Sequence, residues 1–162
     1  MEPVEEMRET LKNESFRLYV AVHEAAHIEY ARRAGAIGFQ YHGPMEYPGR
    51  PGVYGNAGVE PVFPTPGVAI SLQVMARWYC APGVVTKRLS PRWWHEGEDR
   101  EDYEVYRDYC ARRTKATPED VDENWKAAQE DVERDLLSPA FRRKLWDLAH
   151  EVERKIPWGI GQ

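Results

Sequence analysis

Two histidines four residues apart constrain this chain more than any other feature of its sequence. They belong to the run His23-Glu24-Ala25-Ala26-His27, which has the pattern HExxH. Residues i and i+4 lie one above the other on an α-helix, so both imidazoles can reach one ion, and Glu24 lies on an adjacent face close to any metal-bound water. The pattern therefore predicts a helix that carries a metal site with His23 and His27 as ligands.

The residues around this motif are those of a long helix. From about Leu11 to Ala34 the sequence has few helix breakers, and apolar side chains recur every three or four residues before Gly35, which is expected to end the helix. The small and apolar neighbours in YVAVHEAAHIEY favour a functional site, because an unpaired Glu24 buried among them would be costly. The alternative is that both histidines are core residues and Glu24 is incidental.

Zinc is the metal expected here, because it binds imidazole well and a catalytic zinc keeps one tetrahedral position for water. A metzincin would take its third ligand from a histidine six residues after the second one, with a glycine midway, but these positions are Arg33 and Tyr30. That class is excluded. Spacing alone leaves open the candidates His42, His95, Glu96, Asp99, Asp102, Cys110 and His150.

The other elements are predicted from breakers and caps. A short strand is expected over 36–41, and the Gly/Pro-rich segment 43–67 limits regular structure to short extended pieces such as GVEPVF. Thr65-Pro66 predicts the start of an apolar helix that ends near Ala81-Pro82-Gly83. The last three helices are expected over 98–113, from Thr117-Pro118 to about Leu137, and from Ser138-Pro139 to about Lys155.

Together these elements predict a mostly α-helical α+β fold, a zincin-like domain of about five helices with a small extended or β portion. A length of 162 residues fits a single domain, 1–162. Two cysteines, Cys80 and Cys110, are too few for a disulfide framework and lack the paired spacing of a zinc knuckle, so both are expected to be buried thiols.

Composition excludes several classes of protein. With 42% hydrophobic residues and a net charge of −5, the chain is neither disordered nor suited to a polyanion, so nucleic acid is not an expected partner. The N-terminal run MEPVEEMRETLKNES is acidic and polar where a secretory signal is basic and then apolar, and no stretch is long and apolar enough for a membrane span. We therefore expect a soluble, cytoplasmic protein with no membrane insertion.

Two segments, VAVHEAAHIEYARRAGA and YCAPGVVTKRLSPRWWHEGEDREDYEVY, resemble the peptidase domain of FtsH-type membrane metalloproteases and their stand-alone soluble relatives. In that family the HExxH helix is followed by a small-residue stretch and then by an aspartate early in the next helix, which is the third zinc ligand. Here 80–85 occupies the small-residue place and Gly97 leads to Asp102. The resemblance thus implies Asp102 as the third ligand, with Asp99 as the runner-up.

This resemblance covers about half of the chain, roughly 20–106, with Ala26 in place of the usual glycine. The chain has no GxxxxGK[ST] phosphate loop, so the ATPase part of the long family members is not expected. What the resemblance implies is a free-standing zinc metallopeptidase. Zinc would polarise the scissile carbonyl, and Glu24 would take a proton from the attacking water and pass it to the leaving amine.

Three further parts of the sequence each have two interpretations. The segment 43–67 either presents an extended edge to which a peptide adds as a strand, or is a connecting loop. Trp93 and Trp94 either shape a substrate pocket or, more simply, pack in the core. In the last two helices an apolar stripe predicts a packing surface, with docking of a partner or a second copy of the chain as the alternative. The stripe consists of Trp125, Val132, Leu136 and Leu145.

A second class of function, different from a peptidase, also fits this sequence. The same scaffold would also suit a non-enzymatic, metal-stabilised binding or regulatory domain, because the chain has no recognisable element that delivers a substrate. Zinc bound without any cleavage of peptides would favour this rival.

Overall fold

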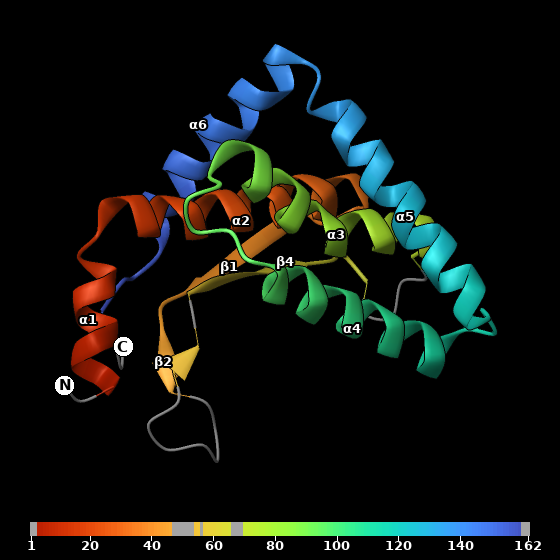
Figure 1. Ribbon diagram of the computed structural model, residues 1–162, viewed down its shortest axis with the longest axis horizontal. Helices are drawn as coiled ribbons and strands as arrows, with labels where there is room; N and C mark the ends of the chain where they lie inside the picture. Colours follow the sequence, from red (N-terminus) through yellow and green to blue (C-terminus); the bar gives the residue numbers. More distant parts are fainter. Residues whose placement is uncertain (1–2, 47–53, 56, 66–69, 160–162) are drawn as a thin grey trace.

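The helix that carries the HExxH motif lies at the centre of the structure, a computed structural model that describes residues 3–46, 54–55, 57–65 and 70–159 (Figure 1). This helix, α2, spans Glu14–Arg33. Its N-cap is Asn13, whose side chain accepts a hydrogen bond from the backbone N–H of Ser15. Just past its C-terminus Gly35 has a φ of 105°, a conformation that glycine adopts without strain.

A short helix that was not predicted, α1 (Pro3–Leu11), precedes α2. The predicted start of the long helix at about Leu11 is therefore wrong, because Asn13 caps a new helix at Glu14 and separates it from α1. Asparagine is favoured at such a position because its side chain satisfies a backbone N–H that has no partner within the helix.

Two antiparallel strand pairs follow α2. Strand β1 (Gly38–His42) pairs with β4 (Gly58–Val62), and β2 (Met45–Glu46) pairs with β3 (Tyr54–Gly55). In the described part of the Gly/Pro-rich segment, regular structure is limited to short extended pieces, as predicted, GVEPV among them. The rest of that segment, residues 47–53, 56 and 66–69, lies outside the described residues.

Helix α3 (Leu72–Leu89) differs from its prediction at both ends. Its N-cap is Ser71, which accepts a hydrogen bond from the N–H of Val74, so it does not begin at Thr65-Pro66; Pro66 itself lies outside the described residues. It also continues through Pro82, where we expected it to end. A proline inside a helix removes one backbone hydrogen bond, and the tight packing of α3 against α2, α4 and α5 compensates for that loss.

Three more helices follow: α4 (Glu96–Arg113), α5 (Pro118–Asp135) and α6 (Pro139–Lys155). Helices α5 and α6 begin where the cap signals predict, whereas α4 begins two residues before its predicted start at 98. Thr117 and Asp120 form a reciprocal capping box at α5, and the hydroxyl of Ser138 accepts a hydrogen bond from the N–H of Phe141 at α6. Proline fits the first position of both α5 and α6, where no helical N–H is needed.

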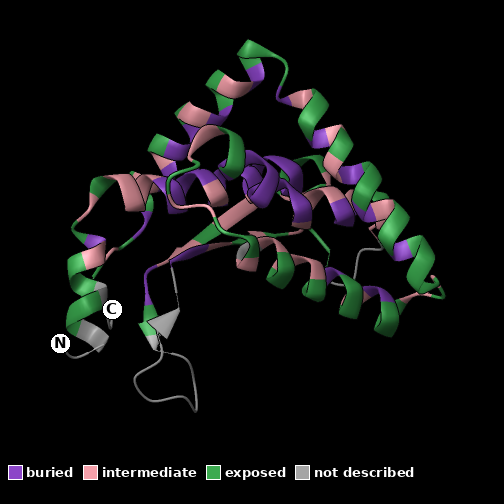
Figure 2. Cartoon of the chain, in the orientation of Figure 1, coloured by how far each residue is buried: buried purple, intermediate pink, exposed green. Residues whose placement is uncertain are grey.

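Helices α3 and α6 and strand β4 pack around α2, while α4 and α5 pack against α3. The buried residues in Figure 2 are concentrated on α2 and α3. The apolar stripe of α5 and α6 lies in this same core, which confirms the predicted packing surface. The fold is mostly α-helical α+β, as predicted. Within the part of the chain that is described, no helix has the length and apolar character needed to cross a bilayer.

Candidate metal centre

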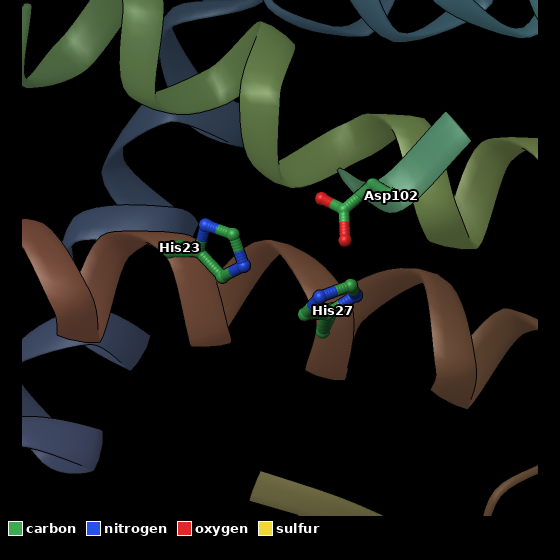
Figure 3. Close-up of side chains that lie close together, drawn as sticks. All are labelled: His23, His27 and Asp102. Atoms are coloured by element: carbon green, nitrogen blue, oxygen red, sulfur yellow. The ribbon is translucent and has the colours of Figure 1, made fainter. Parts of the chain in front are cut away.

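Three of the predicted site residues converge in the structure. His23 and His27 project from the same side of α2, and Asp102 from α4 faces them (Figure 3). Each offers one ligand atom, and these atoms all lie within 4.8 Å of one another. Zinc bonded tetrahedrally at about 2.1 Å would set its ligand atoms about 3.4 Å apart, so the three side chains fit the ion after a small inward movement. Across the described residues, no other group of His, Cys, Asp or Glu has this arrangement.

His27 is oriented by a backbone carbonyl of α3. Its Nδ1 lies 3.1 Å from the carbonyl oxygen of Trp78, so Nδ1–H donates to that oxygen and Nε2 is left to bind a metal. Burial, with a smaller effect of nearby His23, lowers the pKa of His27 to about 3, although the hydrogen bond to Trp78 acts in the opposite direction. At neutral pH His27 is therefore uncharged, which is the form that binds a metal.

Pro82 explains why the Trp78 carbonyl is open to His27. In an α-helix the N–H of residue i donates to the carbonyl of residue i−4, and Pro82 lies four residues after Trp78 in α3. Because proline has no N–H, this helical hydrogen bond does not exist, and the carbonyl accepts from the His27 imidazole instead. The helix defect at Pro82 therefore coincides with the point where α3 contacts the candidate metal centre.

Replacing Pro82 by alanine is expected to weaken zinc binding by up to about tenfold, because the new N–H competes with His27 for the Trp78 carbonyl. The same change is expected to stabilise the metal-free protein by roughly 1–3 kcal/mol, because a helix interior without proline is favoured. Competition titrations with a zinc chelator and urea unfolding would measure the two effects. Pro118→Ala, at the start of α5, is the control and should leave zinc affinity as in the wild type. An unchanged zinc affinity in Pro82→Ala would contradict this account.

Glu24 is buried directly beside the two histidines, with 8% of its surface exposed. Its Oε2 accepts a hydrogen bond from the backbone N–H of Val59 in β4, at 3.1 Å. Burial raises the pKa of Glu24 to about 7, a rise that Asp102 adds to and that His23 and the Val59 N–H oppose. A carboxylate whose pKa lies near neutral pH is suited to accept a proton and to return it.

The pKa values of Glu24 and His27 predict a characteristic pH dependence of stability in the metal-free protein. The folded pKa of Glu24 is raised from 4.5 to about 7, so its stabilising contribution is present at low pH and is lost as the pH rises through this window. The folded pKa of His27 is lowered from 6.5 to about 3, so its contribution is present above pH 6.5 and is lost as the pH falls. The two slopes oppose each other between pH 4.5 and 6.5.

Removing the carboxylate with Glu24→Gln should therefore make the metal-free protein gain stability with rising pH more steeply than the wild type does. The difference should approach about 1.4 kcal/mol per pH unit between pH 4.5 and 6.5. Urea unfolding at several pH values in this window, in the presence of a chelator, would measure it. Parallel pH profiles of the two proteins would show that burial does not shift the pKa of Glu24.

Asp99, the runner-up ligand, lies against α3 and is not in the group formed by His23, His27 and Asp102. A Cβ added to Gly83 would overlap the Asp99 carboxylate, which therefore rests directly on the backbone of α3. The small-residue stretch 80–85 thus receives the first turn of α4, and Asp102, one turn further along α4, reaches the histidines.

Burial, with smaller effects of Asp102 and Asp99, raises the pKa of the Cys80 thiol. Cys80 and Cys110 are both buried free thiols, as predicted.

The remaining candidate ligands are not part of the group. His95 and Glu96 are exposed at the start of α4, and His150 is exposed on α6 with its ring 6.1 Å from that of Trp146. Cys110 is fully buried in the core. His42 lies in β1, on the Glu24 side of the centre.

Trp93 and Trp94 both pack against neighbouring side chains. The Trp93 ring lies 5.1 Å from that of Phe16, edge to face, and its Nε1–H donates to the hydroxyl of Ser15. Lys87 lies over the ring of Trp94, 4.7 Å from the ring centroid. These contacts support the packing interpretation and fix the segment before α4 against α2 and α3.

Sequence reasoning missed several groups that build the site. Two of them are backbone groups, the carbonyl of Trp78 and the N–H of Val59, and no side-chain pattern reveals the second. A signal for the first was present in the sequence, because a proline within an apolar helical stretch frees the carbonyl four residues before it. Interpreting Pro82 as the end of the helix hides this signal.

Neither a scan against protein-family models nor searches of curated proteins and of solved structures finds a match to this chain.

Proposed function

We propose that this protein is a zinc-dependent metallopeptidase that hydrolyses peptide bonds. The observation that carries the proposal is the convergence of His23, His27 and Asp102 beside the buried carboxylate of Glu24. Two imidazoles and one carboxylate are a common protein ligand set for catalytic zinc. Bound there, zinc would polarise the scissile carbonyl and acidify a coordinated water.

Glu24 supplies the proton transfers in this proposal. Its side chain accepts a proton from the attacking water and donates it to the nitrogen of the leaving amine as the C–N bond breaks. The Val59 N–H fixes the carboxylate through Oε2, and burial keeps its pKa near 7. A base with this pKa can both accept and release a proton at neutral pH.

In this proposal the substrate would bind along strand β4. Val59 uses its N–H for Glu24, so this N–H points away from β1, and the edge of β4 opposite β1 runs past the carboxylate. An extended peptide that added to this edge as a further strand would bring its backbone carbonyls to the site. The resemblance to FtsH-type peptidase domains suggests the same chemistry, with Asp102 as the third ligand.

Two measurements on the purified protein test this proposal. Elemental analysis should find about one zinc per chain, and a peptide library should be cleaved in a reaction that a chelator stops and added zinc restores. Stoichiometric zinc with no cleavage of any peptide would contradict the peptidase and favour a metal-stabilised binding or regulatory domain. A protein that takes up no zinc would contradict both.

A further inference from the structure

A third histidine lies beside the Glu24 carboxylate. His42 in β1 is paired with Gly58 in β4, and its ring covers that glycine. A Cβ on Gly58 would lie 2.8 Å from Cε1 and 2.9 Å from Nε2 of the ring, and 3.8 Å from Oε1 of Glu24. The Cε1–Nε2 edge of the imidazole and Oε1 of Glu24 therefore both lie close to the backbone of Gly58.

The glycine at this position serves to make room for the ring. Among the described residues, the positive-φ conformation that favours glycine occurs at Gly35 and not at Gly58. Any L-residue can adopt the backbone of Gly58, so what the site uses is its lack of a Cβ. With a side chain at position 58, the His42 ring could not occupy the place it has beside Glu24.

The surroundings of His42 favour one tautomer. Its Nδ1 is buried and has no hydrogen-bond partner in the described part of the chain. A proton on Nδ1 would be a buried donor without an acceptor, whereas Nε2 lies at the ring edge close to Gly58, where Oε1 of Glu24 also lies. The tautomer that carries its proton on Nε2 is therefore favoured.

We propose that His42 donates a hydrogen bond from Nε2 to the oxygen of the scissile carbonyl as negative charge develops on it. This inference rests on the proposed peptidase function. Val59 holds Oε2 of Glu24, so Oε1 is the oxygen that takes the proton of the attacking water, and both Oε1 and Nε2 of His42 lie close to Gly58. The carbonyl carbon that this water attacks is then within reach of Nε2–H.

No proton leaves His42 in this step. The water oxygen bonds to the carbonyl carbon, its proton passes to Glu24, and the C–N bond breaks as Glu24 protonates the nitrogen. The N–H of His42 stabilises the carbonyl oxygen while it carries negative charge, as donors in an oxyanion hole do.

Replacing His42 by alanine should lower kcat by roughly 10²–10³-fold, with KM and zinc content close to those of the wild type. His42→Gln keeps an N–H donor and should recover part of the loss. The substrate is a peptide that the wild type cleaves in the library, and the second probe is the phosphonamidate of that peptide, which imitates the tetrahedral intermediate. The affinity of the His42→Ala variant for this phosphonamidate should fall by the same factor as its kcat/KM. An interaction that is made only in the transition state changes both quantities equally.

Gly58→Ala provides an independent route to the same result, since the added methyl displaces the ring. It should lower kcat in the wild type but have no further effect in the His42→Ala background, as a double-mutant cycle would show. Gly38→Ala in β1 is the matched control, because a Cβ there meets nothing within 4 Å, and it should not change kcat.

Different results would contradict the peptidase function and the role of His42. A wild-type protein that binds zinc and cleaves nothing contradicts the peptidase function. An active wild type whose His42→Ala variant keeps its kcat, or loses activity without losing affinity for the phosphonamidate, overturns the role of His42 alone.

Discussion

Replacing Glu24 by glutamine is expected to lower kcat for peptide cleavage by on the order of 10²–10⁴-fold while zinc stays bound. The amide has nearly the same shape, and its oxygen can still accept the hydrogen bond that the Val59 N–H donates to Oε2. It cannot take a proton from the attacking water. Steady-state kinetics of the zinc-loaded variant, with elemental analysis of the same sample, would separate loss of the base from loss of the metal.

Glu29 offers a matched control on the same helix. It is as deeply buried as Glu24, with 4% of its surface exposed, but it forms ion pairs with Arg33 and Lys144 away from the metal centre. Glu29→Gln should therefore keep kcat and lower the midpoint of thermal unfolding, because it removes the charge of a buried carboxylate that pairs with two exposed cations. Full activity in Glu24→Gln at full zinc content would show that Glu24 is not the base.

Asp102→Asn is expected to weaken zinc binding by on the order of 10²-fold or more, and to abolish activity at zinc concentrations that saturate the wild type. The amide oxygen is neutral and is a much poorer zinc ligand than a carboxylate, and a three-ligand site depends strongly on each of its ligands. In the structure Asp102 comes from α4, whereas both histidines come from α2. The variant should therefore keep its helical circular dichroism while losing the metal.

Asp99→Asn is the paired control, because it makes the same change one turn earlier in α4, at a carboxylate that is not in the group of donor atoms. The Asp99 carboxylate rests on Gly83, so its amide should change zinc affinity by no more than a few-fold. Competition titrations of both variants with one chelator would compare them directly. If Asp99→Asn lost zinc and Asp102→Asn retained it, the third ligand would be Asp99.

The elements that could be predicted from the sequence are those whose ends are set by local chemistry. Thr117-Pro118 and Ser138-Pro139 place a hydroxyl acceptor and a proline at the start of a helix, and α5 and α6 begin there. The same reasoning failed at Pro82, because packing of α3 against three other helices outweighs the local cost of a missing hydrogen bond. It also missed the cap at Asn13, which divides α1 from α2.

Within the site, the neighbouring positions of His23, Glu24 and His27 on one helix follow from the sequence, because the helical period places residues i and i+4 together. Which carboxylate faces them is a matter of how α4 packs on α3, and Gly83, by accommodating Asp99, leaves Asp102 to face the histidines. The pKa of Glu24 and the orientation of His27 depend on the tertiary structure. Burial raises the pKa of Glu24, and the backbone carbonyl of Trp78 in α3 orients His27. A sequence pattern specifies side chains along one helix, whereas the desolvation and hydrogen bonds that tune them come from the elements packed around it.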